Sequence, residues 1–332
     1  MDRAANAARH RAKKRAGLML LCALLAGLCS ACGGKPLAER EVVHAILYAK
    51  GMEGYTAVLV VANTAGAEDT PYKIAADSGV SPAQALHHAE QALEGVPFYG
   101  VTELLGLPAG TTWEEAVSIG GELRAITQPA PEIETLLLDG QTAMTLEKNA
   151  AKLYQSIRAA EKRYGLDCGT ERLFAQPGAI VLPQYNAAGY RLVTMRQGEA
   201  PYTAASALES QLGAVLSGQS DRIECTFAGD TARFSAGVEA IYDVQPTAEG
   251  SRLRVTARLN LREPSLTSYL MEDEESLRNE LQRAVNAALD TLLQNSGYPQ
   301  TDLFHFGFWA ACYDEQAAGN NVFPRVELVF PQ

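Results

Sequence analysis

A short apolar segment behind a cluster of basic residues near the N-terminus most constrains where this chain folds. Six Lys and Arg residues come first, and an apolar run then extends from Leu18 to Leu28. A run of this length is too short to span a bilayer as a permanent helix, which takes about 20 residues. The small residues Ser30 and Ala31 lead to Cys32. This order is typical of a secretory signal, predicted here to cover residues 1–31.

The cysteine directly behind the small residues resembles the acylation site of bacterial lipoproteins. The resemblance implies that Cys32 receives a diacylglycerol and becomes the first residue once the leader is removed. The motif departs from its usual form because Cys29, and not a leucine, stands three residues before Cys32. Cys29 is a poorer lipid site, since Leu28 would then stand at the cleavage position. An ordinary cleaved signal with an incidental cysteine is the alternative, and the Gly33–Gly34 tether favours lipidation.

The chain behind the leader is strongly acidic. The sequence carries 28 Lys and Arg against 39 Asp and Glu, a net charge of −11. Residues 1–31 hold six bases and one acid, so their removal gives −11 − 5 = −16. Such a surface repels nucleic-acid phosphates and anionic headgroups, so nucleic acid is not an expected partner. An acylated Cys32 is therefore the expected link to the bilayer, because two acyl chains anchor stably at about 0.8 kcal/mol per buried methylene.

Helix and strand patterns are mixed along the 332 residues, which predicts an α+β fold of two to three subdomains. We expect an N-terminal α+β domain over residues 32–188 and a C-terminal α+β domain over residues 189–332. In the first half, strands are predicted at 42–48, 55–62, 98–101 and 135–139, and helices from Ser81–Pro82 onward, at 113–124 and at 146–164. Residues 63–80 are expected to form a loop and residues 166–189 to be irregular.

The second half shows cleaner alternation of apolar and polar residues. Strands are predicted at 190–195, 222–227, 232–244, 251–261 and 325–330, and helices at 204–216 and 272–294. Residues 252–261 place arginines on one face and aliphatic side chains on the other, as in a sheet with one solvated face. The C-terminal domain is therefore predicted to be an antiparallel sheet packed against the long helix.

Motifs for catalysis or metal binding do not stand out. The sequence has no phosphate loop, dinucleotide fingerprint or nucleophile elbow. His87 and His88 are adjacent, so on a helix they point apart and do not converge on one metal. His44 and His305 lie among apolar residues and are expected to pack in the core. Beyond Cys32 three cysteines remain, an odd and widely spaced set that implies no disulfide framework or zinc motif: Cys168, Cys225 and Cys312.

One aromatic stretch near the C-terminus allows two interpretations. It contains Phe304, Phe306, Phe308 and Trp309. These side chains either fill the core beneath the long helix, which is the simpler interpretation, or form a partner-docking patch, because interfaces also favour aromatic residues.

The order of several motifs resembles the Ger(x)C family, the lipoprotein C subunit of spore germinant receptors. The matching pieces follow the acylated cysteine over nearly the whole chain: Arg40–Glu41, SPAQALHHAEQAL at 81–93, Gly120–Leu123, PEIETLLLDGQTA at 131–143, LESQLGAVLSG at 208–218, and Asp302 with the aromatic stretch. The chain departs from the family at Gly33–Gly34, where the family commonly has Trp-Asp. It also departs before the last strand, where the family's tryptophan-bearing segment is reduced and Trp309 is the only tryptophan nearby.

The resemblance implies a non-enzymatic extracytoplasmic protein without a cofactor. It would be anchored by Cys32 to the outer face of the cell membrane or inner spore membrane, with integral-membrane A-type and B-type receptor subunits as partners. A substrate-binding lipoprotein of a transporter is the alternative, but that class usually has parallel sheets, and the alternating strands at 222–261 argue against it. A surface hydrolase is disfavoured because nucleophile and metal motifs are missing from the sequence.

Overall fold

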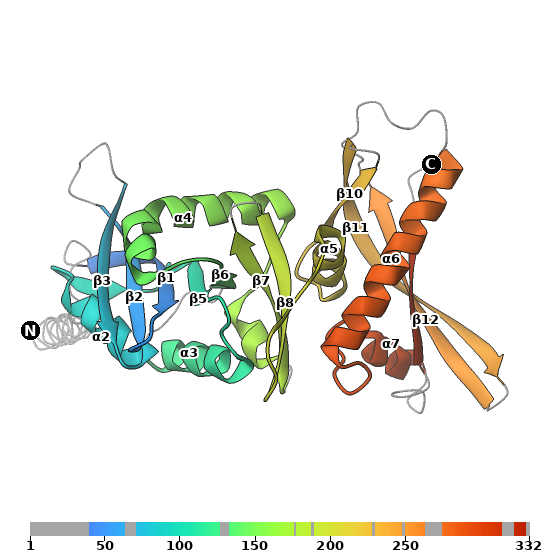
Figure 1. Cartoon of the computed structure of the whole chain (residues 1–332), viewed down its shortest axis with the longest axis horizontal. Helices are drawn as coiled ribbons and strands as arrows, with labels where there is room; N and C mark the ends of the chain where they lie inside the picture. The colour runs from blue at the N-terminus through green and yellow to red at the C-terminus, as the bar shows by residue number, and fades with distance from the viewer. Residues whose placement is uncertain are drawn as a thin grey trace, which may run out of the picture. The chain divides into compact units, whose positions relative to one another are not determined.

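The computed structural model describes residues 40–63, 71–126, 133–175, 177–186, 189–227, 230–247, 250–262, 274–313 and 322–329. The predicted leader and Cys32 lie outside these residues. The chain divides into two units, Met1–Arg40 and Glu41–Gln332, and the second contains all but one of the described residues. This second unit is an α+β structure with a nine-stranded and a four-stranded sheet, which confirms the predicted fold class (Figure 1).

The first sheet has antiparallel flanks around a parallel centre. Its order is β3-β2-β1-β5-β6-β7-β8-β9, and β4 pairs with β1. Its strands are β1 (Arg40–Lys50), β2 (Tyr55–Ala62), β3 (Tyr72–Gly79), β4 (Val96–Phe98), β5 (Leu104–Pro108), β6 (Glu134–Leu138), β7 (Ala179–Asn186), β8 (Gly189–Arg196) and β9 (Tyr202–Thr203). The strands predicted at 42–48 and 55–62 are confirmed as β1 and β2, which pair as an antiparallel hairpin. Strands β1, β5, β6 and β7 run parallel because helical crossovers connect β5 to β6 and β6 to β7.

Helices cover both faces of this sheet. Helices α2 (Pro82–Gln91) and α3 (Trp113–Ile126) pack on one face, and α4 (Ala143–Tyr164) packs on the other, as Figure 1 shows for α3 and α4. The predicted helix starts are confirmed. The Ser81 hydroxyl accepts the N–H of Gln84 at 3.2 Å, and the Thr112–Glu115 capping box closes in both directions.

The second sheet has the order β10-β11-β12-β13. Its strands are β10 (Arg222–Phe227), β11 (Asp230–Thr247), β12 (Gly250–Arg262) and β13 (Val322–Val329), and its helices are α5 (Ala207–Leu216), α6 (Glu274–Ser296) and α7 (Phe306–Tyr313). Strands β10 to β12 are antiparallel, as predicted, whereas β13 runs parallel to β12 because α6 and α7 intervene between them. Side chains on β12 alternate between buried and partly exposed, which confirms one solvated face.

Several elements differ from the sequence prediction. Strand β3 occupies part of the predicted loop, and its sequence YKIAADSG lacks alternation because it forms the edge of the sheet beside β2. The stretch predicted to be irregular contains a 3₁₀ helix, Thr170–Phe174, the whole of β7 and the first residue of β8, which pairs with β7 as a hairpin. The predicted domain boundary at residues 188 and 189 lies between these paired strands, and the domain division stays a prediction.

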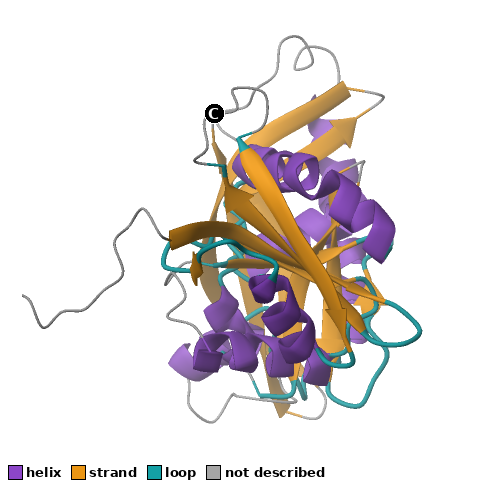
Figure 2. Ribbon diagram, turned by 90° about the vertical axis from the view of Figure 1, so that its left-hand side faces the viewer, coloured by secondary structure: helices purple, strands orange, loops and turns teal. Residues whose placement is uncertain are grey.

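The helices lie against the strands of both sheets in the side view of Figure 2. Among the helices that the structure describes, none is both long enough and apolar enough to cross a membrane.

Candidate functional site

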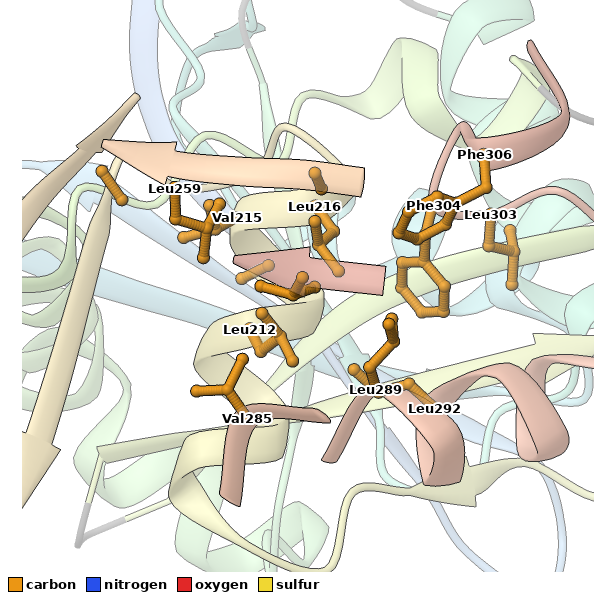
Figure 3. Packing of buried hydrophobic residues seen from close by; sticks show 14 of the residues in the cluster. Leu212, Val215, Leu216, Leu259, Val285, Leu289, Leu292, Leu303, Phe304 and Phe306 are labelled. Atoms are coloured by element: carbon orange, nitrogen blue, oxygen red, sulfur yellow. The ribbon is translucent and has the colours of Figure 1, made fainter. Parts of the chain in front are cut away.

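The aromatic stretch predicted from the sequence divides between core and surface. Phe304 and Phe306 are 1% and 0% exposed and lie in the core near Leu289 and Leu292 (Figure 3). Trp309 is half-buried, whereas Phe308 is 62% exposed. Core filling therefore accounts for the first two phenylalanines. The docking role stays a prediction, and Phe308 is the member of the stretch best placed to test it.

The histidines among the described residues do not converge on one site. His305, expected to pack, is exposed, and its positive φ of 63° sets it at the turn before α7, so that prediction is wrong. His44 is half-buried, with ring centroids 5.6 Å from Tyr72 and 6.0 Å from Tyr154. His88 bonds the Ser78 carbonyl at 2.8 Å. Within the described part of the chain, no three His, Cys, Asp or Glu side chains are placed to hold a metal ion.

A polar cluster that the sequence did not predict lies where the last turns of α4 meet the amino ends of β5 and β6. The Arg158 guanidinium lies between two carboxylates, with Nη1 2.6 Å from Glu161 Oε2 and Nε 3.5 Å from Glu103 Oε2. The Tyr154 hydroxyl donates to Glu103. Glu134, at the start of β6, accepts the backbone N–H of Cys168. One guanidinium therefore lies among three carboxylates.

Burial determines the charge state of this cluster. Glu161 is 7% exposed, and its Oε1 has no hydrogen-bond partner among the described residues. Desolvation raises the pKa of Glu161 to about 7 because burial outweighs the attraction of Arg158. Burial also raises the pKa of Glu134. The cluster is therefore suited to hold a proton near neutral pH.

An open cleft of about 820 Å³ adjoins the cluster. Glu134, Arg158 and Glu161 line one side of it, and the turn at residues 218–222 lines the other. Cys168, whose backbone N–H bonds Glu134, is 2% exposed, and burial raises the pKa of its thiol, so it is a poor nucleophile. The arrangement can exchange a proton or accept hydrogen bonds, but the described residues do not pair a nucleophile with a base.

One position in the sequence does point to this cluster, namely Glu161 within the apolar stripe of α4. The buried stripe of α4 is Leu146, Ala150, Tyr154, Ile157 and Glu161. The helix predicted at 146–164 was not expected to bury Glu161. A glutamate at helical spacing within an apolar stripe is the pattern that identifies a buried carboxylate. Glu103 and Glu134 are far from Glu161 in sequence, and only the sheet topology brings them together.

Comparison with known proteins identifies no family for this chain. No family model and no curated protein matches the sequence. One solved structure, described as "Crystal Structure of the GerBC protein", is similar at a TM-score of 0.41 and 9% sequence identity, over 86% of this chain and 97% of that chain. A TM-score below 0.5 does not establish a common fold, so this likeness assigns no function to the chain.

Proposed function

We propose that this chain is a non-enzymatic lipoprotein subunit of a spore germinant receptor. In this proposal, acylated Cys32 holds it at the outer face of the cell membrane or inner spore membrane, beside integral-membrane A-type and B-type subunits. The observation that carries the proposal is the N-terminal order of basic residues, short apolar run, small residues and cysteine. The net charge of −16 behind the leader supports a lipid anchor, because such a surface gains nothing from anionic headgroups.

Two further observations support the receptor part of the proposal. The motifs that resemble the Ger(x)C family occur in the family's order from Arg40 to the aromatic stretch at residues 304–309. The second sheet packs against a long helix, α6, which fits the α+β organisation predicted from the sequence. The buried thiol of Cys168, with its raised pKa, favours a structural role over a catalytic one.

Membrane fractionation of cysteine variants tests the anchor. Cys32→Ala is expected to leave the membrane fraction and to lose the diacylglycerol mass, whereas the matched control Cys29→Ala is expected to keep both. A Cys32→Ala protein that still sediments with membranes contradicts lipid anchoring at this residue.

Deletion of the gene tests the receptor role separately. Spores are expected to form normally but to lose nutrient-triggered germination, and the intact gene is expected to restore it. If the deleted strain germinates normally in response to every nutrient tested, the receptor role is wrong even where the anchor is correct.

A substrate-binding lipoprotein of a transporter remains a second candidate because of one observation. An open cleft of about 790 Å³ lies at the carboxyl ends of the parallel strands β6 and β7, where ligands of α/β sheets commonly bind. Asp139, directly after β6, and Asn186, at the end of β7, border it together with Lys152 and Ser156 of α4. A neighbouring gene for a transport ATPase favours this candidate, whereas neighbouring genes for a permease-like and a second membrane protein favour the receptor.

A further inference from the structure

A second open groove, of about 890 Å³, lies along α6 and the strands β12 and β13. Its volume is in the range of small-molecule sites. Three arginines line it, Arg254 on β12, Arg278 on α6 and Arg325 on β13, together with one carboxylate, Glu327. Glu327 is engaged by Arg258, whose Nε lies 3.1 Å from Glu327 Oε2. Arginines therefore outnumber carboxylates among the residues that line the groove, although the whole chain carries a net charge of −11.

The sheet register gathers two of these charges on one face. Arg254 lies opposite Phe323, and Arg325 is two residues beyond Phe323, so the arginines are diagonal neighbours across the β12–β13 pair. Like charges on adjacent strands repel each other unless an anion lies between them. The Arg325 guanidinium lies 4.1 Å from the centroid of the Phe323 ring, which limits its freedom to move away.

The carboxylates beside Arg254 and Arg325 satisfy these two arginines only weakly. Arg254 Nη1 is 3.7 Å from Asp243 Oδ2, and Arg325 Nη1 is 3.6 Å from Asp290 Oδ1. Both separations exceed the 2.7–3.2 Å typical of a hydrogen bond, and both carboxylates are mostly exposed, so these ion pairs contribute little. Among the described residues, Arg254 Nε is buried and has no hydrogen-bond partner, which costs stability.

The opposite wall of the groove is fixed by hydrogen bonds to β13. The Gln282 amide of α6 bonds Val326 O at 2.6 Å and Leu328 N at 2.9 Å, and Asn286 Oδ1 accepts the Val326 N–H at 3.4 Å. These bonds hold α6 against the strand edge. The position of α6 beside the arginines of the strands is therefore fixed before any ligand enters.

We propose that this groove binds an oxyanion of the phosphate class, from a free phosphate compound or a phospholipid headgroup. Arg254 and Arg325 meet Asp243 and Asp290 only at 3.7 Å and 3.6 Å, so both guanidinium groups keep donors for the oxygens of a phosphate group. The planar fork of arginine donates paired hydrogen bonds to phosphate oxygens. An anion bridging Arg254 and Arg325 also relieves their mutual repulsion.

Binding of inorganic phosphate to the purified full chain in a neutral maltoside detergent tests the proposal at constant ionic strength. Calorimetry is expected to show saturable binding that weakens at least tenfold in the Arg254→Ala/Arg325→Ala double variant. Arg283→Ala, an exposed arginine of α6 outside the groove, is the matched control and is expected to bind as the original chain does. Arg254→Lys, which keeps the charge but not the fork, is expected to bind more weakly and serves where the double variant does not fold.

A second arm distinguishes the source of the phosphate. Phosphatidylglycerol is added to the same micelles, and hydrogen–deuterium exchange is followed along β13 and α6. Protection by inorganic phosphate indicates a free phosphate compound, and protection by phosphatidylglycerol alone indicates a headgroup. Absence of both effects, or equal binding by the original chain and the Arg254→Lys variant, overturns the proposal.

Discussion

Gln282 of α6 closes the free edge of the second sheet by bonding Leu328 of β13. Its Oε1 accepts the Leu328 N–H at 2.9 Å, and its Nε2 donates to the Val326 carbonyl at 2.6 Å. At the opposite edge of the same sheet, the Gln211 side chain of α5 accepts the N–H of Glu224 on β10. Glutamines from two helices thus form hydrogen bonds with backbone groups that an exposed edge strand would otherwise offer to another chain.

Removal of the Gln282 amide should therefore weaken both the fold and the protection of its edge. Gln282→Ala leaves Val326 O and Leu328 N without their partner, and the free energy of unfolding is expected to fall by about 1–3 kcal/mol. Urea denaturation measures this change, and light scattering measures self-association. Gln294→Ala, at an exposed position on the same helix, is the control. Equal effects of the two substitutions contradict the role given to Gln282.

Glu161 should make stability depend on pH around neutrality. Its pKa is about 7 in the folded chain, against 4.5 for an ordinary glutamate. Between these values the folded state holds a proton that the unfolded state has lost, so stability is full below pH 4.5 and falls as the pH rises through 7. The difference corresponds to about 3 kcal/mol lost by pH 8.

Glu161→Gln is the variant that measures this effect, because its amide remains neutral at every pH. The variant is expected to flatten the pH dependence and to be more stable than the original chain at pH 8. Glu147→Gln, on the exposed side of the same helix, is expected to leave the profile unchanged. Urea midpoints at intervals from pH 5 to pH 8 provide the comparison. A profile of the Glu161 variant that still falls as steeply rules out this carboxyl as the source.

Two helical glycines should respond in opposite directions to alanine. A Cβ at Gly213 of α5 would collide with Leu192 of β8 and lie 3.3 Å from Leu292 Cδ2 of α6, so Gly213→Ala is expected to cost about 1–3 kcal/mol. A Cβ at Gly121 of α3 meets nothing within 4 Å, so Gly121→Ala is expected to gain about 0.5–1 kcal/mol. Thermal unfolding of both variants checks the signs, and a stabilising Gly213→Ala refutes the close packing of α5.

Phe306 and Phe308 separate folding from partner docking. Phe306→Ala empties a core position and is expected to lower the free energy of unfolding by about 3–5 kcal/mol. Phe308→Ala, at an exposed position, is expected to change stability by no more than about 0.5 kcal/mol. Calorimetry measures both, and co-purification with membrane partners is expected to weaken for Phe308→Ala. Unchanged co-purification would refute the docking role of Phe308.

Patterns among residues that are close in the sequence predict much of the fold. The caps at Ser81 and Thr112 and the alternation in β12 depend on neighbouring residues, so the sequence reveals them directly. Strand β5 escaped prediction because its sequence LLGLP is short and buried on both faces, which leaves no alternation to detect. The parallel centre of the first sheet, and the meeting of Glu103 with Glu161, depend on contacts between distant segments that no local pattern records.

The apolar core around α5 extends continuously from one sheet to the other. It includes Val181 of β7 and Leu192 of β8 as well as Leu212 of α5 and Val285 of α6. A truncation between residues 188 and 189 would separate the two strands of a hairpin and expose apolar core residues in each fragment. Fragments of this protein should therefore end elsewhere, because the predicted domain boundary at residues 188 and 189 divides a hydrophobic core that both sheets share.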